Sequence, residues 1–392
     1  MIDFNYYTPT KVVFGKNSEQ KLPSLIKEFG GTKILLMYGG KSAERSGLLG
    51  EVEGYLNEAG ISFVKLGGVV PNPRLSLVRE GMELCRKEGV DFMLAVGGGS
   101  VIDTCKAISA GLCYDGDVWE IYETKKGPDH FLPVGCVLTL PAAGSEMSNS
   151  SVITNEDGWL KKGFECDGYR CKFAIMNPER TYTLPAWQTA SGATDIMMHT
   201  MERYFSKEDD MEITDSIAEA LLRTTMSAAT KALAEPENYE ARAQLMWAGS
   251  LSHNGLTGCG TIGDWATHRL EHELSGIFDV SHGAGLAAVW GSWARYTMNE
   301  NISRFARFAV NVMGVVPKAS DAETAEAGIQ ATEAYFRSIG MPTDIKTLIG
   351  RQVTDEEISL MADKCSNWGK ITVGQLKKLE REDMAAIYRM AN

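Results

Sequence analysis

The 392-residue sequence lacks the features of a membrane or secreted protein. No apolar run approaches the ~20 residues that a membrane-spanning helix needs. The start, MIDFNYYTPTKVVFG, has neither a basic region nor an apolar stretch, so the sequence predicts no signal peptide. Low-complexity tracts and fixed-period repeats are also missing. These absences favour a globular protein that stays in the cytoplasm and does not enter the membrane.

The eight cysteines include no C-x-x-C pair. A chain of this length needs no disulfide staples, so we expect free thiols in a reducing compartment and no zinc ribbon. Basic residues are also in deficit, with 39 Lys and Arg against 51 Asp and Glu. The resulting net charge of -12 gives no electrostatic reason to bind nucleic acid or an anionic membrane.

The residues that are present divide the chain into two parts of different texture. In the first part, strand-like runs alternate with amphipathic helical segments, which is the pattern of parallel α/β units. The second part is rich in Ala, Met, Leu and Glu, and its apolar period is helical. The sequence therefore predicts an α/β domain over residues 1–185 and an all-helical domain over residues 186–392. The strand-like runs are KVVFG, KILLMYGG, ISFVKLGGV, DFMLAVGGGS, FLPVGCVLTLP and CKFAIMNP.

A glycine cluster stands between a buried strand and a helix that we expect to begin near Val101. Gly97, Gly98, Gly99 and Ser100 leave room for a phosphate to approach backbone N–H groups at the start of that helix. Dinucleotides bind at this place in parallel α/β sheets. The spelling is not G-x-G-x-x-G, so a tight turn without a ligand is the alternative interpretation.

A second polar segment, TLPAAGSEMSNSSVIT at residues 139–154, also follows a strand. Thr139, Ser145, Asn149 and Ser151 can donate hydrogen bonds to a phosphate, a ribose or a nicotinamide amide. The alternative is an ordinary loop of small residues. This segment therefore predicts a cofactor contact only in combination with the glycine cluster.

A second glycine motif and two histidines receive no functional assignment. Gly258, Gly260 and Gly263 in GCGTIG match G-x-G-x-x-G, but they follow a helical segment, so we interpret them as a helix break and not as a nucleotide loop. His253, just before them, has the position of a helix-end residue, and His130 lies in a loop-like stretch. Neither histidine is assigned a role.

The other four of the six histidines form a spaced pattern with one aspartate. Asp195 and His199 are four apart in DIMMHTMERY, which places both on one helix face. His268 and His272 have the same spacing in DWATHRLEHELSG, and His282 follows in DVSHGAG. Carboxylate and imidazole together suit Fe(II), Zn(II) or a similar ion. No H-E-x-x-H motif is present, so hydrogen-bonded pairs without a metal are the alternative.

In this order, AVGGGSVID, AAGSEMSNSSVIT, DIMMHTMERY, THRLEHELSG and SHGAGLA resemble motifs of the iron-containing (group III) alcohol dehydrogenases. The fit is best to the branch of butanol dehydrogenases and aldehyde reductases, and it covers essentially the whole chain. The resemblance implies a dehydroquinate synthase-like architecture, with an active site in the cleft between an α/β and an all-helical domain. It also implies a homodimer that pairs the strand TKVVFG.

The resemblance further implies a metal site and a proton path. Asp195, His199, His268 and His282 would bind Fe(II) or Zn(II). His272 would be a catalytic residue that does not bind the metal and faces the substrate. In such a site the nicotinamide exchanges a hydride with the substrate carbon, and the metal acts as a Lewis acid at the substrate oxygen.

The same resemblance assigns the cofactor residues. Gly97–Ser100 would bind the pyrophosphate, and Asp103 would lie near the nicotinamide or ribose as a second catalytic candidate. Lys161, or its neighbour Lys162, would reach the ribose. The remaining positions that would line the cofactor are Thr139, Leu140, Ser145 and Asn149.

The choice between NAD(H) and NADP(H) rests on the turn after the strand KILLMY. An acidic side chain at this place commonly holds the ribose hydroxyls of NAD. Here the turn contains Gly39, Gly40, Lys41 and Ser42, with Arg45 close by, and no acid follows the strand directly. Cations and hydroxyls suit a 2′-phosphate. The sequence therefore favours NADP(H) over NAD(H), with Gly39, Gly40 and Ser42 as contacts.

The substrate we expect is a short- to medium-chain primary alcohol or its aldehyde. The first alternative is a glycerol-type or hydroxy-acid oxidoreductase with the same two domains. A non-redox synthase that retains NAD and a non-catalytic metal- or nucleotide-binding protein are the others. Four apolar residues are candidates for the substrate wall, although their character fits core packing equally. They are Met147, Phe164, Leu256 and Trp265.

Overall fold

The computed structural model describes all 392 residues, and the chain divides into two compact units. No helix is both long enough and apolar enough to pass through a bilayer. One helical stretch beyond the predicted boundary at residue 185 belongs to the same unit as the sheet. The α/β unit contains Tyr7–Leu184 and Glu237–Ser250, and the helical unit contains Met1–Tyr6, Pro185–Pro236 and Leu251–Asn392.

A six-stranded, fully parallel sheet forms the centre of the α/β unit, in the order β1-β8-β5-β4-β2-β3. Its four central strands are apolar on both faces. In β2, for example, Ile34 and Leu36 join one core and Leu35 and Met37 join the other. Burial of both faces is what a parallel sheet covered by helices requires. The strands are β1 Lys11–Phe14, β2 Lys33–Tyr38, β3 Ser62–Leu66, β4 Phe92–Gly97, β5 Val134–Leu138 and β8 Phe173–Met176.

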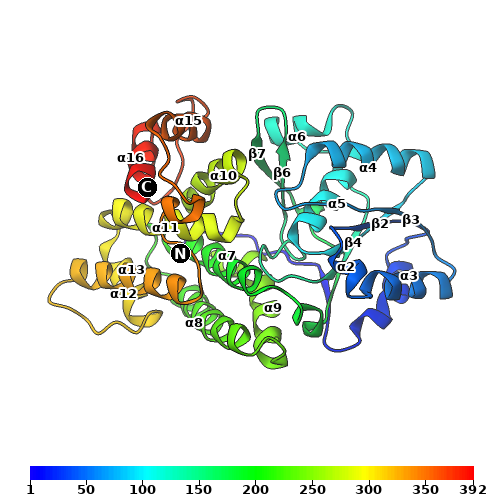
Figure 1. The fold of residues 1–392 in the computed structure, drawn as a ribbon, viewed down its shortest axis with the longest axis horizontal. Helices are drawn as coiled ribbons and strands as arrows, with labels where there is room; N and C mark the ends of the chain where they lie inside the picture. Colours follow the sequence, from blue (N-terminus) through cyan, green and yellow to red (C-terminus); the bar gives the residue numbers. More distant parts are fainter. The chain divides into compact units, whose positions relative to one another are not determined.

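Each of the six sheet strands lies in one of the six strand-like runs of the sequence, and the helices that connect them are visible in Figure 1. A separate antiparallel hairpin, β6 with β7, is an addition that the sequence did not predict. Its first strand begins inside the segment 139–154, whose serines favoured a loop. The hairpin strands are Ser150–Asn155 and Leu160–Glu165, and the helices are α1 Leu22–Glu28, α2 Ser42–Arg45, α3 Leu48–Glu58, α4 Leu75–Glu88, α5 Gly99–Leu112 and α6 Val118–Thr124.

The helical unit has a core of its own, in which aromatic side chains pack against one another. Phe205 stacks on Phe305 with ring centroids 4.2 Å apart, and Trp290 and Trp293 are almost fully buried. Together the two units confirm the predicted fold class. The helices are α7 Ala186–Tyr204, α8 Glu212–Ala234, α9 Tyr239–His253, α10 Ala266–Phe278, α11 His282–Thr297, α12 Ile302–Asn311, α13 Asp321–Ser338, α14 Ile345–Ile349, α15 Asp355–Cys365 and α16 Arg381–Ala391. Of these, α9 begins in the α/β unit and ends in the helical unit.

Candidate functional site

The glycine cluster forms the turn between β4 and α5, at the carboxyl edge of the sheet. A Cβ on Gly98 would lie 3.1 Å from the Cβ of Leu140, and one on Gly99 would lie 2.8 Å from that of Ala143. Glycine is therefore needed here because the turn packs directly against the segment that follows β5. The structure brings together two of the predicted cofactor segments, which are far apart in the sequence.

The turn after β2 lies at the same edge, because β2 is the neighbour of β4 in the sheet. Gly39 leads into it, and a Cβ there would lie 3.8 Å from the Cγ2 of Val101 on α5. Around Gly40 there is open space, and Ser42 begins α2. The carboxyl ends of β2, β4 and β5 thus bring three of the predicted cofactor segments to adjacent positions, the place where α/β sheets bind dinucleotides.

Asp103, one turn into α5, binds the 139–154 segment with both carboxylate oxygens. Its Oδ1 accepts a hydrogen bond from Ser145 Oγ at 2.5 Å, and its Oδ2 accepts one from the Val152 N–H at 2.9 Å. Burial raises the pKa of Asp103, and the charge of Lys106 and the bond from Ser145 oppose this rise. The carboxylate that the resemblance predicts to be catalytic thus accepts hydrogen bonds from Ser145 and Val152 of the same chain.

The two adjacent lysines of β7 differ in their surroundings. Lys162 donates to Glu123 at 3.4 Å and lies over the Trp119 ring at 5.4 Å. Lys161 lies within electrostatic reach of Asp103 and lowers its pKa. Lys161 is therefore close enough to Asp103 for its charge to act on that carboxyl group, and its contact with the ribose stays a prediction.

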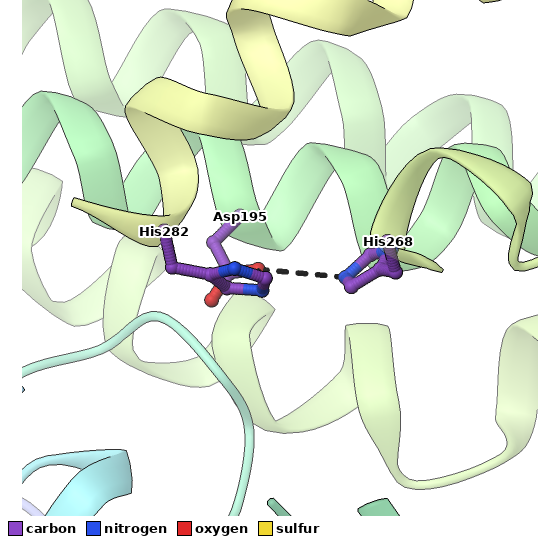
Figure 2. Close-up of side chains that lie close together, drawn as sticks. All are labelled: Asp195, His268 and His282. Atoms are coloured by element: carbon purple, nitrogen blue, oxygen red, sulfur yellow. Dashed lines mark ion pairs between the residues drawn. The ribbon is translucent and has the colours of Figure 1, made fainter. Parts of the chain in front are cut away.

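In the helical unit, three helices bring a carboxylate and imidazole rings to one place. Asp195 lies on α7, His268 on α10 and His282 at the first position of α11. The Asp195 Oδ1 lies 3.8 Å from His268 Nε2 and 3.7 Å from His282 Nε2. Figure 2 shows the three side chains pointing toward one another. Their candidate ligand atoms all lie within 4.8 Å of each other.

His199 contacts the same carboxylate from one turn further along α7. Its Nδ1 lies 3.5 Å from Asp195 Oδ1, so the four-residue spacing does place both side chains on one face. His199 stands beside the group of Asp195, His268 and His282 and is not part of it. Burial, and then the charge of His253, hold the pKa of His199 well below its usual value. A lowered pKa favours the neutral ring, which is the form that binds metals.

The atoms around Asp195 have the chemistry and the spacing that a divalent cation requires. Asp195 Oδ1, His199 Nδ1 and His268 Nε2 are buried without a hydrogen-bond partner. Two ligands of one tetrahedral ion stand about 3.4 Å apart, since each bond is about 2.1 Å long. The distances around Asp195 are close to this value, and a carboxylate with imidazoles is a ligand set for Fe(II) or Zn(II).

Two buried glutamates that the sequence reasoning missed orient the imidazoles. Glu202 on α7 accepts from His268 Nδ1 at 3.0 Å and from the His268 N–H at 2.8 Å. Glu271 on α10 pairs with His282 Nδ1. Carboxylates in this position fix the ring orientation of metal-binding histidines. Their spacing in the sequence is the pattern that could have identified them, because Glu202 stands three residues after His199 and Glu271 three residues after His268.

His272 lies at the margin of the site. Its ring centroid is 5.9 Å from that of His282, and one of its ring nitrogens lies within 4.8 Å of candidate ligand atoms of Glu271 and His282. It does not belong to the group formed by Asp195, His268 and His282. Its predicted role as a catalytic residue that does not bind the metal stays a prediction.

A fifth histidine joins the cluster although the sequence gave it no role. The ring of His253, the last residue of α9, lies 4.0 Å from that of His199. Trp265 borders both rings, with its centroid 5.7 Å from His253 and 6.2 Å from His199. The Arg203 guanidinium lies 4.5 Å from the Trp265 ring. Of the remaining apolar candidates, Met147 and Phe164 are buried core residues, and Leu256 is half-buried.

The glycines of SHGAGLA allow α11 to approach its neighbours closely. A Cβ on Gly283 would collide with the backbone carbonyl oxygen of Ser191 on α7. A Cβ on Gly285 would lie 2.8 Å from the Cγ of Glu271, the partner of His282. The two glycines therefore determine how near His282 can come to Asp195.

Known protein families match both parts of the chain. Residues 9–178 match the family described as iron-containing alcohol dehydrogenase, and residues 189–392 match the C-terminal domain of the Fe-containing alcohol dehydrogenase family. A probable NADH-dependent butanol dehydrogenase of Bacillus subtilis is 42% identical over 99% of both chains. The NADPH-dependent aldehyde reductase YqhD of Escherichia coli is 35% identical over 100% of both.

Among solved structures, an NADH-dependent butanol dehydrogenase of Thermotoga maritima superposes with a TM-score of 0.95 at 37% identity, covering 100% of this chain and 99% of the other. The chain therefore belongs to the iron-containing alcohol dehydrogenase family, in the butanol dehydrogenase branch, which confirms the resemblance. It is an enzyme that links a nicotinamide cofactor to the interconversion of alcohols and aldehydes. The non-redox synthase and the non-catalytic binding protein lose their support.

The first prediction concerns the packing of α11. Gly283→Ala should lower the free energy of unfolding by about 1–3 kcal/mol, because the new methyl group forces α11 away from Ser191. Gly50→Ala is the control, since α3 has open space there and the change should be neutral or stabilising by about 0.5–1 kcal/mol. Calorimetry and a crystal structure measure both effects. A Gly283→Ala protein with unchanged stability and unmoved helices would contradict the close packing of α11 against Ser191.

Proposed function

We propose that the chain interconverts short- to medium-chain primary alcohols and aldehydes of the butanol and butanal type. The observation that carries the proposal is the convergence of three imidazole nitrogens within 3.8 Å of one buried carboxylate oxygen, Asp195 Oδ1. The names of the Bacillus and Thermotoga relatives support this substrate class. Asp195, His199, His268 and His282 would hold the metal, either Fe(II) or Zn(II).

When they are bound, the divalent ion supplies a Lewis acid for the substrate oxygen and the nicotinamide supplies the hydride acceptor or donor. The chain's own residues orient the side chains that would bind the ion. Glu202 and Glu271 fix the rings of His268 and His282, so that each ring presents its Nε2 toward Asp195. Buried side chains fixed in this way need no rearrangement when the reaction occurs.

His272 would hold and release the proton that the alcohol oxygen loses on oxidation and regains on reduction. It is partly exposed, and it lies at the edge of the ligand group, where a ring nitrogen can exchange protons with solvent. An imidazole titrates near neutral pH, which suits general acid and base catalysis. The Asp103 carboxylate, held by Ser145 and Val152, would serve cofactor binding in the α/β unit.

The cofactor assignment rests on the turn after β2. Gly40 has open space around it, and both Lys41 and Ser42 are exposed. Glu44, the nearest acid along the chain, lies two residues into α2 and not at the strand end. A 2′-phosphate fits such a turn, so we propose NADP(H) as the preferred cofactor and NAD(H) as the weaker one. The name of the E. coli relative agrees with this order, and that of the Bacillus relative does not.

We also propose a cytoplasmic homodimer. The first strand, β1, lies at one edge of the sheet and pairs with β8 alone, and the Phe14 side chain at its end is 40% exposed. An open strand edge of this kind is a site for pairing with a second chain. All eight cysteines are free thiols, which fits a reducing compartment.

An assay of butanal reduction tests the function. The metal-free protein should be inactive, and activity should return with Fe(II) or Zn(II). With metal, kcat/KM should be higher for butanal than for glyceraldehyde or a 2-keto acid, and higher with NADPH than with NADH. A preference for either competing substrate would favour the glycerol-type or hydroxy-acid alternative, and a strong NADH preference would overturn the cofactor order.

Removal of one ligand tests the metal site. His268→Ala should lose the bound metal and the turnover together, because the remaining side chains no longer surround the ion. His130→Ala is the matched control, since His130 is an exposed loop residue and should change neither. Metal content by mass spectrometry and kcat measure the outcome. Full metal content with full activity in His268→Ala would show that this ring is not a ligand.

Removal of the proposed proton carrier gives a different result. His272→Ala should bind the metal normally but turn over about 10²- to 10⁴-fold more slowly, since a general acid-base group contributes about this factor. The limb of the pH–rate profile that belongs to this imidazole should disappear. The profile of His130→Ala provides the comparison. A His272→Ala profile that keeps the wild-type shape would remove His272 from the proton path.

A further inference from the structure

A lysine that the mechanism does not use is fully buried beneath the predicted cofactor segments. Lys106 lies on α5, three residues after Asp103, and its side chain has no exposed surface. Its Nζ donates to the carbonyl oxygens of Ser145 at 2.7 Å, Ser148 at 3.1 Å and Ser150 at 2.8 Å. The Ser148 hydroxyl is a fourth partner, at 3.3 Å.

An ammonium group is costly to bury, and it is retained only where acceptors surround it. Lys106 has three donors and four acceptors within reach, all on residues 145–150. The charge of Lys106 also acts to lower the pKa of two carboxyl groups, those of Asp103 and Glu146. The carbonyls of this loop consequently point inward to one charge and cannot reorient independently.

Asp103 binds the same segment from the adjacent turn of the helix. It accepts from Ser145 and from Val152, and its own carbonyl oxygen accepts from Ser151 Oγ at 3.0 Å. A cation and an anion on one face of α5 thus hold the chain from residue 145 to residue 152. The beginning of this stretch stands beside the glycine turn, because a Cβ on Gly99 would lie 3.9 Å from the Cβ of Ser145.

We infer that Lys106, together with Asp103, is a positioning residue that holds the 145–152 segment in the shape that binds the nicotinamide cofactor. The inference rests on the proposed function. It assigns Lys106 no contact with cofactor or substrate. Its effect passes through Ser145 and Asn149, which the family resemblance places against the cofactor, and through the glycine turn packed beside them.

The test compares three variants by direct binding. Lys106→Met removes the ammonium while nearly keeping the side-chain length, and the Kd for NADPH, measured by calorimetry, should rise by about tenfold or more. Ser148→Ala removes one of the four acceptors, so its Kd should rise by about two- to fivefold. Lys87→Met changes an exposed lysine of α4 in the same unit and should bind NADPH as the unaltered protein does.

Kinetics distinguish positioning from a role in stability alone. In Lys106→Met the KM for NADPH should rise, whereas the KM for butanal at saturating NADPH and the metal content should stay unchanged. Lower thermal stability with an unaltered Kd per folded molecule would overturn the inference. If Lys106→Met does not fold, Ser148→Ala decides, and an unchanged Kd there counts against the inference. If the unaltered protein binds neither NADPH nor NADH, the proposed function fails instead.

Discussion

Burial of the Asp195 carboxylate among imidazole rings is the constraint on which the site depends. Its Oδ1 is buried and has no hydrogen-bond partner, although three ring nitrogens stand within 3.8 Å. Glu202 and Glu271 add two further buried carboxyl groups behind the rings. Buried negative charge is costly unless a cation or hydrogen bonds compensate it, and a divalent ion among these atoms would do so.

The helical unit holds these groups by crossed contacts between helices. The glutamate of α7 holds the histidine of α10, and the glutamate of α10 holds the histidine of α11. Gly283 and Gly285 permit the close approach of α11 that such contacts need. In the α/β unit, charged residues of α5 act in a comparable way on the 145–152 segment. Both units therefore use buried charged side chains to hold neighbouring segments in one defined shape.

Local sequence patterns were sufficient for much of this arrangement. Strand-like runs identified the six strands of the sheet, and the four-residue spacing identified the shared face of Asp195 and His199. Contacts between distant residues were not predictable in the same way. His268 and Glu202 are 66 positions apart, and nothing in either segment alone indicates that they meet. Hairpin strand β6 was missed because its serines are typical of loops, whereas pairing with β7 stabilises it as a strand.

Anomalous X-ray diffraction from crystals of the metal-loaded protein, recorded at the iron and zinc absorption edges, tests the central claim most directly. A single peak at bonding distance from the Asp195 carboxylate and the Nε2 atoms of His268 and His282, with His199 as the fourth ligand, is the expected result. A peak at another place in the chain, or one that none of these side chains contacts, would contradict the assignment of the metal site.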